Sequence, residues 1–126
     1  MSKDFSAKAI VVVEDDLFVR KYLQDLLSVQ GYAVEAFETT EDARRAVIGD
    51  GRVALLIVDD SMPGVTGTEL IIDLRRAGVG VPAILLGPTV ASYGGSLAAD
   101  FGRVEVVEKP FHSAQLLSAI DRMLTP

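Results

Sequence analysis

Cysteine is absent from this sequence of 126 residues, and aromatic side chains account for only 6% of it. The absence of cysteine excludes disulfide bonds, thiolate zinc sites and catalysis by a thiol. It also fits a reducing compartment, so we expect a cytoplasmic protein. The scarcity of aromatic residues predicts a core of aliphatic side chains, which suits a buried parallel sheet.

Long apolar stretches and an excess of positive charge are also missing. No stretch approaches the roughly 20 apolar residues that a membrane-spanning helix needs, and the N-terminal MSKDFSAK lacks the apolar core of a signal peptide. The 12 basic and 18 acidic side chains give a net charge of −6, which opposes nonspecific attraction to nucleic acid or to an anionic membrane. We therefore expect neither a nucleic acid nor a membrane as a partner.

Five short apolar runs are predicted to form strands. They occupy residues 9–13, 32–37, 53–58, 82–86 and 104–107. The first, third and fourth runs are almost continuously aliphatic, as in strands that are covered on both faces. The second and fifth alternate between apolar and polar residues, so we expect them nearer an edge of the sheet.

Segments with helical spacing lie between these runs. The residues that mark four of them are Val19, Leu23, Leu26, Leu27 and Gln30, ended by Gly31; Ala43, Ala46 and Val47, capped by Thr39 or Thr40; Leu70, Ile71 and Leu74, ended near Gly78; and Leu116, Leu117, Ile120 and Leu124. A shorter helix is expected between Thr89 and Gly102, where Gly94 and Gly95 weaken it. The alternation predicts an α/β fold, a single (βα)5 unit with a doubly wound parallel five-stranded sheet.

Acidic residues follow two of the predicted strands, and a lysine follows a third. Glu14 and Asp15 come after the first strand, Asp59 after the third, and Lys109 after the fifth. Because ligands of open α/β sheets bind beyond the carboxyl ends of the strands, these side chains are expected to converge. Carboxylates gathered in this way would repel one another unless a hard divalent cation such as Mg²⁺ lay among them. Asp16, by contrast, stands where a helix N-cap belongs.

The segments VVVEDD, IVDDSMPGVTG and VEKPF resemble the acidic pair, the phosphoacceptor segment and the lysine-proline motif of response-regulator receiver domains. These CheY-like domains belong to two-component signalling systems, and the resemblance extends from about Ala9 to Leu124. It implies the flavodoxin-like strand order 2-1-3-4-5. It also implies a receiver domain over residues 9–126 after a short extension at residues 1–8.

The same resemblance implies a role for each residue of the pocket. Asp59 would be the phosphoacceptor, and Asp15 and Asp59 would bind Mg²⁺ directly. Glu14 would act through a metal-bound water, and the main-chain carbonyl of Ser61 would supply a further ligand. Lys109 would neutralise the phosphoryl oxygens. The peptide bond before Pro110 is expected to be cis.

Two positions depart from the family pattern. Receiver domains carry threonine or serine at the end of the fourth strand and an aromatic residue three positions before the lysine. Here those positions hold Gly87 and Val106. Thr89 could supply the missing hydroxyl, although Pro88 restricts the backbone and Thr89 also suits a helix start.

The leading hypothesis is a stand-alone phosphoacceptor domain, not a turnover enzyme, which receives phosphate from a histidine kinase or a histidine phosphotransfer protein. It would signal through a downstream protein, and a homodimer could form through the face of the fourth helix, fifth strand and fifth helix. The alternative is a degenerate receiver that acts as a phosphorylation-independent interaction module. A small aspartyl-phosphate phosphatase ranks last, because its acid-x-acid-x-threonine pattern is missing.

Overall fold

The computed structural model describes residues 8–87 and 102–125. Its strands are β1 (Ala9–Val13), β2 (Val34–Phe37), β3 (Val53–Asp59), β4 (Ala83–Gly87) and β5 (Val104–Glu108). Its helices are α1 (Leu17–Val29), α2 (Thr40–Asp50), α3 (Gly67–Arg76) and α5 (Ser113–Leu124). The helix expected from Thr89 to Gly102 lies, except for Gly102, outside the described residues.

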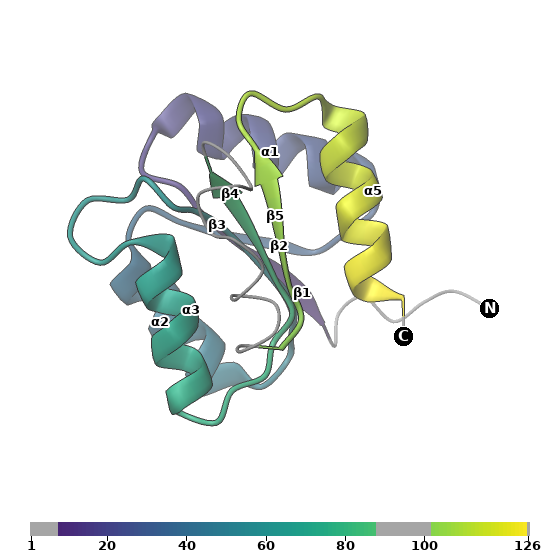
Figure 1. Ribbon diagram of the computed structural model, residues 1–126. Coiled ribbons are helices and arrows are strands. Elements are labelled where there is room, and N and C mark those ends of the chain that lie inside the picture. Colours follow the sequence, from purple (N-terminus) through teal and green to yellow (C-terminus); the bar gives the residue numbers. More distant parts are fainter. Residues whose placement is uncertain (1–7, 88–101, 126) are drawn as a thin grey trace.

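The five strands form one parallel sheet in the order β2-β1-β3-β4-β5. This confirms the predicted strand order and places the two alternating strands, β2 and β5, at the edges. Helices α1 and α5 cover one face of the sheet, and α2 and α3 cover the other (Figure 1). The connection from β1 to β2 and the connection from β2 to β3 thus run in opposite directions across the sheet, as in a doubly wound fold.

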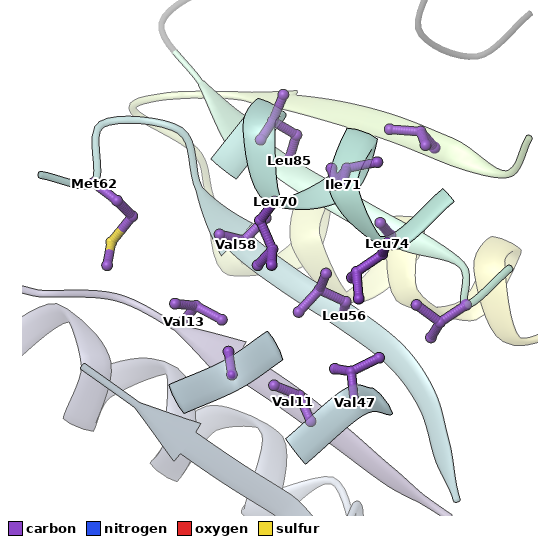
Figure 2. Packing of buried hydrophobic residues seen from close by; sticks show 14 residues of the cluster. Val11, Val13, Val47, Leu56, Val58, Met62, Leu70, Ile71, Leu74 and Leu85 are labelled. Carbon is purple, nitrogen blue, oxygen red and sulfur yellow. The ribbon is translucent and has the colours of Figure 1, made fainter. Parts of the chain in front are cut away.

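Each face of the sheet has its own aliphatic core. On the side of α2 and α3, Leu56 and Val58 of β3 pack with Leu70, Ile71 and Leu74 of α3 (Figure 2). On the side of α1 and α5, Leu55 and Ile57 pack with Leu23, Leu27, Leu116 and Ile120. Full burial of one such side chain stabilises the fold by about 1.5–3 kcal/mol. The continuous aliphatic run of β3 is therefore explained, because neighbouring residues face opposite cores.

The helix ends follow local rules of sequence. Asp16 is the N-cap of α1, where its carboxylate accepts the amides of Phe18 and Val19 at 2.8 and 3.1 Å. Thr39 caps α2 in the same way. The first helix ends at Val29 with Gln30 as C-cap, so Gln30 is not part of its buried stripe, and Gly31 follows with a φ of 95°. Asp16 thus has the capping role that its position predicted.

The fold brings the carboxyl ends of β1, β3 and β5 to the same edge of the sheet. A close packing contact holds the start of α3 against the end of β3. A Cβ atom at Gly67 would lie 2.9 Å from the carbonyl oxygen of Asp59 and 2.8 Å from Cδ1 of Leu85. Only glycine fits there without displacing the backbone of β3.

Among the helices described, none has the length and apolar character that crossing a bilayer requires.

Candidate functional site

Three carboxylates meet at the edge of the sheet. Glu14 and Asp15 follow β1 and Asp59 ends β3, and one oxygen atom of each lies within 4.8 Å of the others. Glu14 and Asp59 are buried, with 2% and 3% of their surface exposed, whereas Asp15 is exposed. The cluster is therefore buried at Glu14 and Asp59 and open to solvent at Asp15.

Both carboxylate oxygens of Asp59 have hydrogen-bond donors. The main-chain amide of Ser61 donates to Oδ1 at 2.9 Å, and the ammonium group of Lys109 donates to Oδ2 at 2.9 Å. Burial raises the pKa of Asp59, but the bonds from Lys109 and from the Ser61 amide outweigh it, so the pKa lies below its usual value. Asp59 is thus held as an ionised, acceptor-only group at neutral pH.

Glu14 has the opposite electrostatic character. Its pKa is raised from 4.5 to about 7, chiefly by burial and further by the adjacent carboxylates of Asp59 and Asp15, while the Asp16 amide partly offsets the rise. Its Oε2 accepts the Asp16 amide at 3.1 Å, while its buried Oε1 has no hydrogen-bond partner among the described residues. A buried carboxylate oxygen without a donor is costly, and a bound cation would satisfy it.

The donor set of this cluster fits Mg²⁺. All the ligand atoms that the three side chains offer are carboxylate oxygens, which this hard cation prefers. The exposed side of the cluster, at Asp15, leaves room for the waters that Mg²⁺ retains. The unpartnered oxygen of Glu14 and the crowding of negative charge both favour a cation at this position.

The structure brings Glu14, Asp15, Asp59 and Lys109 together, as the strand ends predicted. Ser61 lies in the turn directly after β3, where its amide already contacts Asp59. The Lys109–Pro110 peptide bond is cis, as the resemblance implied.

The two substituted positions also lie where expected. Gly87 ends β4, opposite Glu108 of β5, and its carbonyl oxygen accepts the Lys109 amide at 2.7 Å. Val106 is half-buried on β5 and packs against the core beneath α2 and α3. Neither residue has a side-chain hydroxyl or an aromatic ring. Thr89, the candidate substitute, lies outside the described residues.

Two contacts near the site were not predicted from the sequence. The guanidinium of Arg20 on α1 donates to the carbonyl oxygen of Glu14 at 2.9 Å. The side chain of Asp60 accepts both the amide and the hydroxyl of Thr68. The position of Arg20 in the first turn of α1, directly after the acidic loop, could have predicted the first of these contacts. Nothing in the local sequence links Asp60 with Thr68.

Comparison with known proteins identifies the family. The family model described as response regulator receiver domain matches residues 10–121, so the chain belongs to this family. Receiver domains of two-component response regulators bind Mg²⁺ through an acidic pocket, and the cluster of Glu14, Asp15 and Asp59 is the acidic group of this chain.

Relatives among curated proteins are bacterial regulators. The chain is 32% identical over 111 residues to the transcriptional regulatory protein FixJ of Rhizobium meliloti (strain 1021), covering 88% of this chain and 54% of FixJ. It is 31% identical over 122 residues to Nodulation protein W of Bradyrhizobium diazoefficiens, covering 91% of this chain and 51% of that protein. The chain thus spans about half the length of these relatives.

Solved structures show the same architecture. Chemotaxis protein CheY4 of Vibrio cholerae superposes with a TM-score of 0.81 at 25% identity, covering 94% of this chain and 98% of that chain. The structure titled FixJ-N superposes with a TM-score of 0.81 at 27% identity, covering 98% and 95%. The CheY-like fold is therefore shared over nearly the whole chain.

Proposed function

We propose that this receiver domain accepts a phosphoryl group on Asp59 in a Mg²⁺-dependent phosphorelay and signals through a protein partner. The observation that supports this most strongly is the state of Asp59. It is buried and ionised, Lys109 and the Ser61 amide hold its two oxygens, and two further carboxylates lie beside it. This arrangement suits a carboxylate nucleophile.

The transfer step requires one bond to form and one to break. An oxygen of Asp59 attacks phosphorus and forms an acyl phosphate, while the P–N bond of a phosphohistidine donor breaks and its electron pair returns to the imidazole nitrogen. Lys109 leaves its contact with the free carboxylate and balances charge on the phosphoryl oxygens. This makes the chain a phosphoacceptor and not a turnover enzyme.

Four groups would hold the metal. Asp15 and Asp59 would bind it directly, Glu14 through water, and Ser61 through its main-chain carbonyl. When bound, Mg²⁺ neutralises charge that develops on the transferring oxygens. Because the ion favours ionised ligands, its binding would also lower the pKa of Glu14 from about 7.

The proposed partners are a histidine kinase or histidine phosphotransfer protein as donor and a second protein as target. We place the receiver domain at residues 9–126, in the cytoplasm, and propose the face of the expected fourth helix, β5 and α5 as a candidate dimer contact. The longer relatives include a protein named as a transcriptional regulator. The proposed absence of nucleic-acid binding therefore concerns the residues of this chain alone.

A second candidate function is a phosphorylation-independent interaction module. It is favoured by Gly87 and Val106, which lack the hydroxyl and the ring that respond to phosphate in the family pattern. The preserved acidic cluster and Lys109 favour phosphorylation instead.

Intact-mass measurement after incubation with acetyl phosphate and Mg²⁺ tests the proposal. The wild-type protein and Asp60→Asn should each gain the mass of one phosphoryl group, whereas Asp59→Asn and wild-type protein in EDTA should not. Loss of the gain in Asp60→Asn with retention in Asp59→Asn would show that the acceptor is Asp60. No gain in the wild-type protein would favour the interaction module.

A further inference from the structure

The side chain of Asp60 is joined to the start of α3 by two hydrogen bonds. Thr68 donates its amide to Oδ1 of Asp60 at 2.9 Å and its hydroxyl to the same oxygen at 2.7 Å. Both residues are half-buried. Asp60 directly follows the proposed phosphoacceptor and precedes Ser61, so this contact lies within the segment that supplies two of the proposed metal ligands.

The main chain of this segment is held on two further sides. The amide of Asp60 donates to the carbonyl oxygen of Leu86 at 2.9 Å, which extends the contact between β3 and β4 beyond Asp59. On the other side, Gly67 packs so closely that a Cβ atom there would lie 3.1 Å from the Cα of Asp60. The contact between the Asp60 side chain and Thr68 adds a third point at which Asp60 is fixed to its neighbours.

A capping role alone does not account for the hydroxyl contact. Helix α3 already has a capping box, in which the Thr66 hydroxyl accepts the Glu69 amide and the Glu69 carboxylate accepts the Thr66 amide. The Thr68 amide is a further helix-end donor that Asp60 satisfies. The hydroxyl of Thr68 needs no partner for the helix to form, yet it makes the shorter of the two bonds to Asp60.

We infer that Asp60 and Thr68 are positioning residues for the phosphoacceptor segment. By tying the residue between Asp59 and Ser61 to α3, they set the direction of the Ser61 peptide group and so support the Ser61–Asp59 contact of 2.9 Å. Groups that orient metal ligands through a second contact commonly change metal affinity when they are removed. The inference rests on the proposed Mg²⁺ site.

Thr68→Val tests the hydroxyl, because it keeps the side-chain shape and the main-chain amide. Mg²⁺ affinity is measured by NMR titration, exchange of the Ser61 amide is measured in the metal-free protein, and stability is measured by urea unfolding. We expect Thr68→Val to weaken Mg²⁺ binding about three- to tenfold. This is less than the roughly 10- to 100-fold loss that typically follows removal of a group that orients a metal ligand, because the Thr68 amide still binds Asp60. The Ser61 amide should exchange faster, and Thr68→Ser should restore both properties.

Thr125→Val is the matched control. The Thr125 hydroxyl donates to the Asp121 carbonyl at 2.7 Å at the end of α5. Its removal should lower the urea midpoint while leaving Mg²⁺ affinity and Ser61 exchange unchanged. Asp60→Asn keeps an acceptor oxygen and should bind Mg²⁺ within about threefold of wild type, whereas Asp60→Ala should weaken binding about tenfold.

The outcomes separate this inference from the proposed function. If Asp15→Asn abolishes Mg²⁺ binding while Thr68→Val and Asp60→Ala leave both affinity and Ser61 exchange unchanged, the positioning role is overturned and the metal site stands. Failure of Thr68→Ser to restore the wild-type values also overturns it. If the wild-type protein binds no Mg²⁺, or Asp15→Asn binds it normally, the proposed site fails and the inference fails with it.

Discussion

Replacing Glu14 with glutamine should remove most of the pH dependence of stability between pH 5 and 8 in the metal-free protein. Glu14 is 2% exposed, and its pKa in the folded protein is about 7 against a reference value of 4.5. A carboxyl group whose pKa is raised by folding stabilises the native state fully below pH 4.5. That contribution is lost as the pH rises through about 7, because the buried group must then ionise.

The magnitude follows from the two pKa values of Glu14. They differ by about 2.5 pH units, and each unit corresponds to about 1.4 kcal/mol, so the wild-type protein should lose about 3–4 kcal/mol between pH 4.5 and well above 7. Asp59 does not interfere in this range. Its pKa is lowered by folding from 3.8, so its contribution is present above pH 3.8 and is lost only as the pH falls through its folded value.

Urea unfolding in EDTA at pH 5, 6, 7 and 8 measures the effect, and Glu35→Gln, an exposed residue of β2, serves as the control. Wild type and Glu35→Gln should lose stability together as the pH rises, whereas Glu14→Gln should change little. The reasoning is refuted if Glu14→Gln shows the same decline as the wild-type protein.

Three other changes test the site and its surroundings. Lys109→Gln should raise the pKa of Asp59 by removing a direct donor at 2.9 Å, and it should slow the acetyl phosphate mass gain by about a hundredfold; a wild-type rate would contradict the role of this lysine. Gly67→Ala should lower the free energy of unfolding by about 1–3 kcal/mol, because the added Cβ meets the main chain of β3. The control Gly49→Ala in α2 has open space around it and should stabilise the protein by up to about 1 kcal/mol. On binding beryllofluoride, a phosphoryl mimic, amide-exchange changes should stay within the three loops that hold the acidic residues and Lys109, because Gly87 has no hydroxyl and Val106 no ring to respond to it. Strong new protection around Val106 would refute this expectation.

Local sequence was sufficient for most of the fold. The aliphatic runs of β1, β3 and β4 indicated interior strands because both faces of such strands must be covered, and the alternating runs of β2 and β5 indicated the edges. Asp16 and Thr39 were recognisable as caps because a cap needs only a short polar side chain next to its own helix. The strand order came from the family resemblance.

The convergence of Glu14, Asp15, Asp59 and Lys109 also followed from the sequence, because parallel strands end at a common edge. Their different ionisation did not, since the raised pKa of Glu14 and the lowered pKa of Asp59 depend on burial and on donors contributed by other segments. The Asp60–Thr68 contact likewise depends on how closely α3 packs on β3 at Gly67. Periodicity and capping act within a few neighbouring residues, whereas desolvation and side-chain contacts between elements exist only after the chain has packed.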